Sequence, residues 1–363
     1  MRGFVLLPLC LVGGWGASLK VRVDNPPVTG EVVAWVFDSP NSFVDLRDPV
    51  RTVVLPERGA TPDYILDLPA GEYALIVFHD ANKNGIMDKN FIGIPREWLG
   101  FSNRYWPEGP PTFARAAFRL EGDETKTFDV QLRSVFGKTG LLGVGVGVIA
   151  QTSPYRGSSH VIVQPIPVIS YIGDRVQVLG PSANVGILKW RDLGFALTVQ
   201  YRLAAYDEED SPILRGMGDR NSTVMGGLAF QANLPAGIRM SAGFDQDLLG
   251  RVRGGTRKVG MNKSFQGGLF TLSPQVGWTW STAELTNYEF GVSPEKALPD
   301  RPAYSPGTSL SFVCGLGLFI ELPGAWRIVL NGKTAFLPSA VSESPLVDQS
   351  QLMSGFAAVT RLF

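Results

Sequence analysis

The sequence predicts an all-β protein in two parts, an N-terminal antiparallel β-sandwich followed by a transmembrane antiparallel β-barrel of about twelve strands. Three observations lead to this prediction. A short apolar segment at the N-terminus has the features of a secretory signal, the strands after residue 136 alternate apolar and polar residues cleanly, and their connections alternate between long and short. We place the signal peptide at 1–18, the sandwich at 19–135 and the barrel at 136–363.

The first 18 residues read as a signal peptide that is removed on export. Arg2 supplies the positive charge, Phe4–Val12 the apolar core, and small residues follow up to Ser18. The apolar run is shorter than the ~20 residues that a helix needs to cross a bilayer. Its removal takes Cys10 away and leaves Cys314 alone, so we expect no internal disulfide.

Composition argues against a nucleic acid partner and against one kind of metal site. The 33 basic and 33 acidic residues cancel, which gives no electrostatic reason for a nucleic acid partner. The chain has two histidines, His79 and His160, so a transition-metal site built from several histidines is excluded.

Residues 19–135 contain seven candidate strands that are rich in Val, Ile, Phe and Tyr and bounded by Pro, Gly, Asn or Asp. That many short strands in ~115 residues is typical of an antiparallel sandwich. The insert from Asp80 to Pro111 is long and irregular. The candidate strands are Leu19–Val23, Glu31–Phe37, Arg51–Leu55, Tyr64–Leu68, Glu72–Phe78, Phe113–Leu120 and Thr127–Leu132.

The alternation after Gly137 fits a wall between lipid and a hydrated lumen. In Leu272–Ser281, one face carries apolar residues that include Trp278 and Trp280, and the other face is small or polar. Further on, apolar residues alternate with Arg327 and Lys333, whose charges suit a wet lumen better than a dry core. The same alternation places the small residues Gly143, Gly145 and Gly147 on a lumen face, which explains them better than a dinucleotide-binding loop does.

Connection lengths support an outer-membrane barrel independently. Long connections alternate with tight turns, as they do between the outer loops and periplasmic turns of bacterial barrels. The two short strands around Gly180–Ala183 are the pair on which an even strand number depends. The predicted strands are 141–150, 161–171, 174–180, 183–190, 193–203, 221–234, 236–249, 254–266, 268–282, 304–322, 325–337 and 351–363.

Aromatic residues lie near several predicted strand ends and are open to two interpretations. They form interfacial girdles, or they reflect ordinary strand propensity. These residues are Tyr171, Trp190, Tyr201 and Tyr304. The final Phe363 is the type of residue with which outer-membrane barrels commonly end.

Several short motifs in the second half, taken in order, resemble those of one known family. They are Gly143–Gly147, Pro154–Tyr155–Arg156–Gly157–Ser158, Tyr201–Arg202, Asp210–Ser211–Pro212, Leu214, Gly216–Met217, Asp219–Arg220, Asn287–Tyr288, Gly291–Val292, Tyr304 and Gly307. Residues 141–363 thereby resemble the MipA/OmpV family of outer-membrane proteins. The resemblance implies a non-enzymatic barrel embedded in outer-membrane lipid, with a scaffold role for periplasmic murein synthases or hydrolases.

The first half is similar to a small secreted bacterial domain of uncharacterised function with a prealbumin-like sandwich. The resemblance rests on Gly71–Tyr73, His79–Gly85, Asp88, Asn90, Gly93, Pro95, Glu97 and Gly100–Asn103. It implies a periplasmic sandwich in front of the barrel.

One local motif predicts a metal site. Asp80, Asn82 and Asn84 stand at positions 1, 3 and 5 of a calcium-loop pattern, Gly85 at 6 and Asp88 at 9, and the carbonyl of Ile86 would serve position 7. Phe91 stands at position 12, where a bidentate Glu is usual, so the site would need another carboxylate such as Glu97 or water. The alternative is a tract of Asx turns whose side chains bond their own backbone.

Three functions follow as hypotheses. The first is a non-enzymatic scaffold or structural protein of the outer membrane, and the second is a narrow pore for small solutes. The third is a surface-loop hydrolase that uses His160 with Ser158 or Ser159, for which the sequence indicates no orienting carboxylate.

Overall fold

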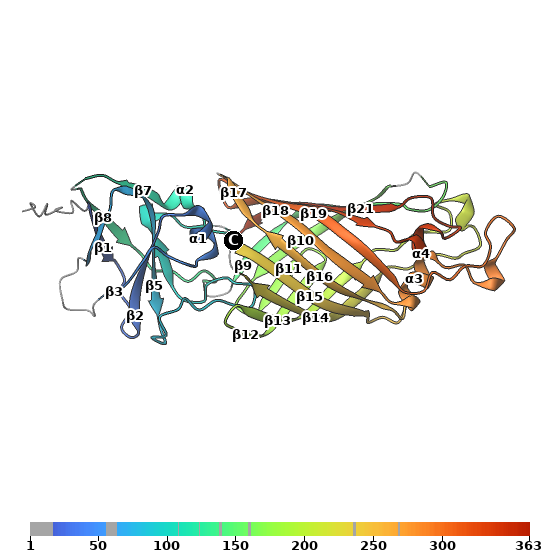
Figure 1. The fold of residues 1–363 in the computed structure, drawn as a ribbon, viewed down its shortest axis with the longest axis horizontal. Coiled ribbons are helices and arrows are strands. Elements are labelled where there is room, and N and C mark those ends of the chain that lie inside the picture. Colours follow the sequence, from blue (N-terminus) through green and yellow to red (C-terminus); the bar gives the residue numbers. More distant parts are fainter. Residues whose placement is uncertain are drawn as a thin grey trace, which may run out of the picture. The chain divides into compact units, whose positions relative to one another are not determined.

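The computed structural model describes residues 17–55, 64–107, 109–122, 124–137, 140–158, 161–234, 237–267 and 269–363. Most of the predicted signal peptide, together with Ser159 and His160, lies outside these residues. The chain forms two compact units (Figure 1). The first comprises Met1–Gly85, Leu99–Trp106 and Phe113–Leu132, and the second comprises Ile86–Trp98, Pro107–Thr112 and Arg133–Phe363.

The first unit contains two small β-sheets. One has the strand order β4-β1-β8, and the other has the order β3-β2-β5-β6 with β7 paired to β5. The strands are β1 Ala17–Val23, β2 Glu31–Phe37, β3 Arg51–Leu55, β4 Tyr64–Leu68, β5 Gly71–Asp80, β6 Leu99–Phe101, β7 Ala117–Leu120 and β8 Thr125–Val130, and the helical turns are α1 Pro40–Asp45, η1 Ser102–Arg104 and α2 Phe113–Ala116.

Alternate residues of the two sheets form the core of this unit. Leu19 and Val21 from β1 pack with Leu75 and Val77 from β5, and all four side chains are fully buried. Because successive side chains in a strand point to opposite faces, one face of each sheet can supply this core. The expected sandwich-like arrangement is confirmed.

The structure differs from the predicted strands at three places. Phe113–Ala116, expected to begin a strand, forms the short helix α2, and the strand begins only at Ala117. The strand β6 lies within the insert that was expected to be irregular. The pair β1–β8 is parallel, whereas an antiparallel sandwich was predicted. Local strand propensity does not determine any of these features, because each depends on contacts with distant residues.

The second unit is a closed antiparallel β-barrel. From β9 to β16 and from β17 to β21, each strand pairs with the next one in sequence, and the pairs β21–β9 and β16–β18 close the ring. The short β17 continues the line of β16 beside β18, so the thirteen labelled strands form a wall of twelve. The strands are β9 Leu141–Thr152, β10 Val161–Ile172, β11 Val176–Leu179, β12 Ser182–Trp190, β13 Leu193–Arg202, β14 Thr223–Asn233, β15 Ile238–Asp247, β16 Gly255–Lys263, β17 Phe265–Gly267, β18 Phe270–Ser281, β19 Ser309–Leu322, β20 Trp326–Phe336 and β21 Gln351–Leu362.

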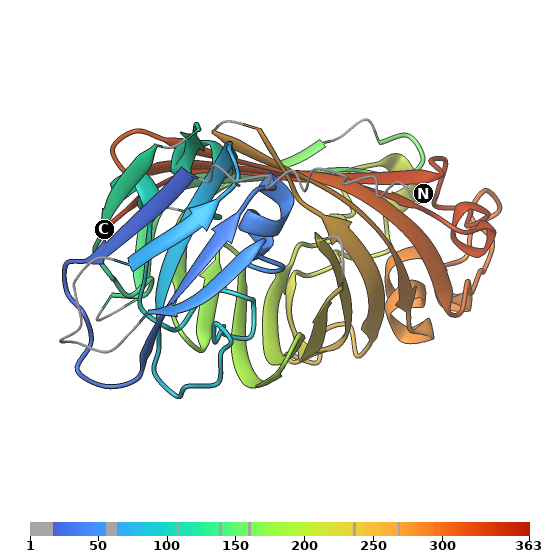
Figure 2. The same cartoon turned by 60° about the vertical axis from the view of Figure 1, so that its left-hand side comes forward.

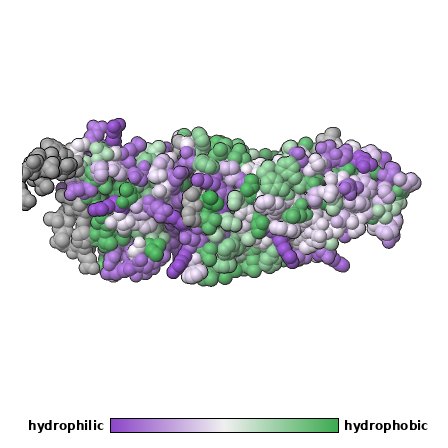
Figure 3. All heavy atoms as spheres, viewed as in Figure 1, coloured by the Kyte–Doolittle hydropathy of each residue, from purple (hydrophilic) through white to green (hydrophobic). Residues whose placement is uncertain are grey.

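The predicted strand number and alternation are confirmed. The two short strands predicted around Gly180–Ala183 are the separate strands β11 and β12, with Leu179 opposite Ser182 across a tight turn. Trp278 and Trp280 are 46% and 43% exposed and pair with Phe312 and Leu310 on the outward face. Figure 3 shows apolar residues gathered over the barrel strands and hydrophilic residues gathered over the long loops.

The two ends of the barrel differ as predicted. Long connections (153–160, 203–222, 282–308 and 337–350) leave one end, which we call the long-loop end, and tight turns such as 191–192 and 323–325 join strands at the other, the short-turn end (Figures 1 and 2). The long loops contain η2 Pro212–Leu214, α3 Ala283–Phe290, η4 Pro294–Lys296 and α4 Ser339–Ser342. None of the described helices has the length and apolar character needed to cross a membrane.

Candidate functional site

The long loops fold together over the barrel mouth. The loops β9–β10, β13–β14 and β18–β19 leave the ring four strands apart from one another, so they are evenly spaced around it. The ring of Tyr155 in the first loop lies 4.7 Å from that of Tyr206 in the second and 6.0 Å from that of Phe290 in the third. Loops from three evenly spaced points can meet in this way only across the opening.

A small apolar core holds these loops together. Nine buried side chains from the four long loops form one cluster, which we call the loop cap. Its residues are Tyr155, Tyr206, Leu214, Met217, Phe290, Val292, Val341, Leu346 and Val347. Close packing of this kind gives a set of long loops a single ordered conformation.

Two arginines tie the loops together by polar contacts. Arg301 donates from Nη1 to the carbonyl oxygens of Ile213 at 2.6 Å and Arg215 at 2.9 Å. The guanidinium of Arg220 lies 5.0 Å from the ring centroid of Tyr206 and 4.8 Å from that of Tyr288, within the range of cation–π attraction. The contacts of Arg301 and the contact of Arg220 with Tyr288 join the β13–β14 loop to the β18–β19 loop.

Burial shifts the ionisation of the cap tyrosines. Removal from water raises the pKa of Tyr206 to about 12, although the nearby Arg220 acts in the opposite direction. Burial and the nearby Glu289 raise the pKa of Tyr155 well above its ordinary value. Both hydroxyl groups therefore stay protonated to a higher pH than a solvent-exposed tyrosine does.

Three of the four predicted girdle residues fall into two groups, and the fourth, Tyr171, is half-buried on β10. Trp190 and Tyr201 are 61% and 41% exposed on strands, as an interfacial position requires. Tyr304 does not begin a strand, because β19 starts only at Ser309. It packs against the loop cap instead and donates its hydroxyl to the carbonyl of Ala340 at 2.9 Å.

The lumen below the cap carries a polar cluster. Asp245 is 8% exposed and accepts hydrogen bonds from Lys258 Nζ at 2.8 Å and from Thr256 Oγ1 at 3.0 Å. The register places Lys333 and Arg327 on this inner face, as the alternation predicted. The lumen wall therefore carries charges of both signs, while the outer wall is mostly apolar.

Part of the long insert belongs to the barrel unit. Asn90, 3% exposed, accepts the backbone N–H groups of Ile92 and Ile94 at 3.2 and 2.9 Å and donates to the carbonyl of Gly173 at 3.3 Å. Arg96 Nε lies 2.7 Å from a carboxylate oxygen of Asp174. These contacts fix the segment Ile86–Trp98, which we call the anchor segment, to the β10–β11 turn.

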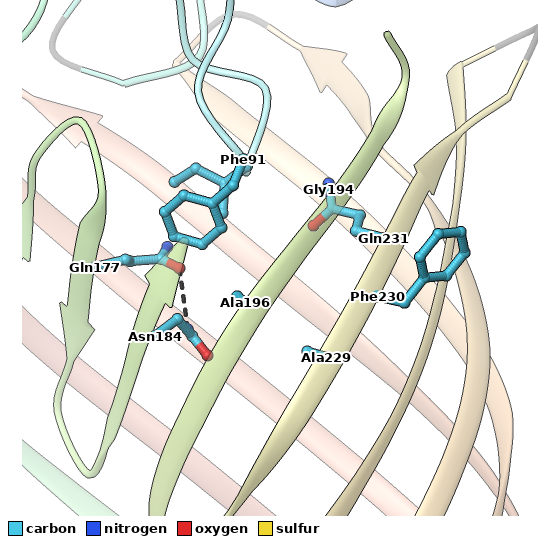
Figure 4. Close-up of a pocket in the computed structure, with 9 residues that line it drawn as sticks. Phe91, Gln177, Asn184, Gly194, Ala196, Ala229, Phe230 and Gln231 are labelled. Carbon is cyan, nitrogen blue, oxygen red and sulfur yellow. Dashed lines mark hydrogen bonds between the residues drawn. The ribbon is translucent and has the colours of Figure 1, made fainter. Parts of the chain in front are cut away.

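Phe91 of the anchor segment reaches the lumen wall (Figure 4). A Cβ added to Gly186 would lie 2.4 Å from the Phe91 ring, and one added to Gly194 would lie 2.3 Å from the Phe91 carbonyl oxygen. Small residues on β12 and β13 therefore make room for this aromatic side chain. Beside it is a cavity of about 110 Å³, where Asn184 donates to Gln177 at 3.2 Å.

The predicted calcium-loop residues make turn contacts. The Asp80 carboxylate is fully buried and accepts the N–H groups of Asn84 at 3.1 Å and Gly85 at 2.6 Å, and Asn82 Oδ1 accepts that of Asn84 at 3.1 Å. Asp88 donates its N–H to Glu97 Oε2 at 3.1 Å, and Ile86 is 64% exposed. Among the described residues, no three His, Cys, Asp or Glu side chains are grouped in a way that could hold a metal. Calcium binding stays a prediction.

Only one of the two histidines lies among the described residues. The His79 ring nitrogen Nε2 lies 2.6 Å from the Thr29 carbonyl oxygen, a contact that suits a structural role. His160 and Ser159, on which the hydrolase hypothesis depends, lie outside the described residues. Ser158 donates its backbone N–H to Tyr155 as part of a turn.

Sequence reasoning did not identify the loop cap or the anchor segment. Residues of both belong to the motifs on which the family resemblances rest, but the sequence does not show which of these motifs lie close together in the folded chain. Tyr155, Leu214, Met217 and Val292 meet in the cap, and Asn90 fixes the anchor segment.

Two known families match the chain, one over its N-terminal part and one over its barrel. Residues 144–363 match the family described as MltA-interacting protein MipA, and residues 21–128 match the family described as an uncharacterized protein conserved in bacteria (DUF2141). The MltA-interacting protein of Escherichia coli is 28% identical over 214 residues, 58% of this chain and 84% of that protein. The outer membrane protein OmpV of Vibrio cholerae is 30% identical over 146 residues, 40% of this chain and 56% of that protein.

A third relative, the putative outer membrane protein YiaT of Escherichia coli, is 24% identical over 226 residues, 61% of this chain and 91% of that protein. Among solved structures, OprB of Pseudomonas putida aligns over 92% of this chain and 93% of its own at 11% identity, with a TM-score of 0.27 that is too low to inform function. The family match covers more than half of the chain and coincides with the twelve-strand barrel. The chain therefore belongs to the MipA/OmpV family of outer-membrane β-barrel proteins.

Proposed function

We propose that this protein is a non-enzymatic scaffold or structural protein of the cell envelope, whose first unit lies in the periplasm. The observation that carries the proposal is the loop cap, because a packed apolar core across the barrel mouth suits an anchor better than a channel. In bacterial barrels the long loops face outward and the tight turns face the periplasm. The sandwich would then be available to soluble periplasmic partners.

The proposed partner is a periplasmic murein hydrolase or synthase. The relatives named MltA-interacting protein support this class of partner. This chain carries an additional unit, matched by a separate family, in front of the barrel. We propose that this unit takes part in holding the partner.

A pull-down from membranes tests the scaffold. The full-length tagged protein, extracted in mild detergent, should retain a murein-active enzyme, and deletion of 19–135 should abolish retention. A heat-dependent shift in gel mobility must show that the deleted variant still folds as a barrel. Retention by the deletion variant would contradict the role of the first unit, and absence of any murein-active enzyme would contradict the scaffold.

The charged lumen supports a second candidate, a narrow pore for small ions or solutes. Lys258 and Lys333 lie on the inner wall, where charged side chains set selectivity. A pore should conduct in a planar bilayer, and Lys333→Gln should shift its ion selectivity. The capped scaffold predicts no steady conductance.

The surface-loop hydrolase is a third candidate that no contact among the described residues favours. A hydrolase should lose activity on His160→Ala. The scaffold predicts that the envelope phenotype of this variant equals that of the wild type.

A further inference from the structure

Charged side chains are rare on the outward wall of the barrel and have one sign. Among the described strand residues, register and alternation place three charged side chains on that wall, and all three are cationic. Arg257 lies near the long-loop end, and Lys263 and Arg361 lie near the short-turn end. An acyl-chain environment tolerates such side chains only near its two boundaries.

Arg257 marks the level of the lipid headgroups at the long-loop end. It pairs with Trp280 on one side and Phe244 on the other, and these rings are 43% and 50% exposed. Aromatic residues of this kind gather where acyl chains meet headgroups. A long cationic side chain at that level can extend its charge into the polar layer while its methylene groups stay in the apolar one.

The adjoining turn between β15 and β16 adds two more arginines. The Asp247 carboxylate accepts the backbone N–H groups of Leu249 at 3.1 Å, Val252 at 2.6 Å and Arg253 at 3.0 Å. The Asp247 N–H donates to the Gly254 carbonyl at 3.0 Å and closes the turn. The acid nearest in sequence is thus engaged by the backbone, and Arg251 and Arg253 stay exposed.

The same turn presents two apolar side chains. Leu248 and Leu249 are 59% and 52% exposed and directly follow the lipid-facing wall of β15. Three arginines next to two exposed leucines form an amphipathic surface that is continuous with the lipid-facing belt. An amphiphile with phosphate groups and acyl chains would satisfy both parts of this surface.

We propose that Arg251, Arg253 and Arg257, with Leu248 and Leu249, form a rim site that binds lipid A, the phosphorylated glycolipid anchor of lipopolysaccharide. The guanidinium groups pair with its phosphates, and the leucines contact its acyl chains. Arg251 already donates to the Ser222 carbonyl, which holds its side chain beside the wall. The site depends on the long loops facing outward and is independent of any murein partner.

Thermal unfolding of the full-length protein in detergent tests the rim site. Added lipid A should raise the midpoint of the wild type, and the triple variant R251Q/R253Q/R257Q should bind it at least tenfold more weakly. The matched control K263Q/R361Q removes the outward cations of the opposite rim and should bind lipid A as the wild type does. Native mass spectrometry of the same samples counts the retained lipid A directly.

Each outcome decides the proposal. Wild-type binding by the triple variant, or equal loss in the control variant, overturns it. An equal response of the wild type to phosphatidylglycerol also overturns it, because the site would then read charge alone. The heat-dependent mobility of each variant shows that its barrel is folded, and an unchanged pull-down by the triple variant separates this inference from the scaffold proposal.

Discussion

Arg202, the last residue of β13, donates a hydrogen bond from Nε to the Oε1 atom of Glu289 in α3 at 3.1 Å. The Glu289 side chain is 12% exposed, and its backbone carbonyl accepts the Tyr155 hydroxyl at 3.2 Å. One residue of the β18–β19 loop thus contacts both the barrel strand β13 and the β9–β10 loop of the cap. The cap is connected to the barrel by charge as well as by apolar packing.

Removal of either partner should loosen the cap. Arg202→Gln or Glu289→Gln leaves a half-buried charge without its partner, which costs about 1–3 kcal/mol. The barrel strands should persist, because their ladders are formed by backbone groups, which these side-chain substitutions leave in place. Trypsin cleavage at Arg215 and Arg220 should become faster in both variants, as measured by the fragments formed over time.

Arg191→Gln serves as a control for this experiment, because it removes an exposed arginine in the β12–β13 turn at the opposite end of the barrel. The double variant should be less destabilised than the sum of the two single variants, since the pair is lost only once. Additive effects would contradict a direct coupling between Arg202 and Glu289.

Deprotonation of Tyr206 should weaken the cap at high pH. The folded-state pKa of Tyr206 is raised to about 12, so its contribution is fully present below the unfolded value near 10 and is lost as the pH rises toward 12. Absorbance of tyrosinate near 295 nm should show a late-titrating step that is absent in Tyr206→Phe. Titration of every tyrosine by about pH 10 would contradict a buried hydroxyl at this position.

Calcium binding to the Asp80–Asp88 loop is a separate prediction. If the loop holds the ion, calcium should raise the thermal midpoint of the full-length protein and a chelator should lower it. Asp88→Asn should weaken calcium affinity measured by calorimetry while leaving the Asp80 turn contacts in place. Equal midpoints with calcium and with chelator would favour the Asx-turn alternative.

The anchor segment should depend on Phe91. Phe91→Ala removes a ring that is 8% exposed, so the segment should lose about 3–5 kcal/mol of local stability. Gly186→Leu should displace the same ring by steric conflict. Proteolysis at Lys89 and Arg96 should accelerate in both variants but not in the control Phe230→Ala, whose outward-facing ring packs on Phe195 instead.

The barrel wall was predictable because its signal is local. Alternation with period two placed Trp278 outward and Lys333 inward without knowledge of any neighbour. Connection length then separated the two ends, and an apolar outer face required closure because an open sheet edge in lipid would leave backbone groups unbonded.

The candidate sites were less predictable because they depend on long-range contacts. Tyr155 and Phe290 are 135 positions apart in sequence and stack in the cap, and Asn90 reaches Gly173 across 83 positions. Phe113–Ala116 adopts a helical turn in a segment that strand propensity assigned to a strand. Such features follow from tertiary packing, which overrides local preference.

Gel mobility of the protein from an outer-membrane fraction, loaded with and without boiling, is the most direct test of the closed twelve-strand barrel. A closed barrel resists detergent, so the unboiled protein should run as a compact band that moves to the position of the full mass of 39.3 kDa, less any cleaved signal peptide, after boiling. Equal mobility before and after boiling, or recovery of the chain in the soluble fraction, would contradict it.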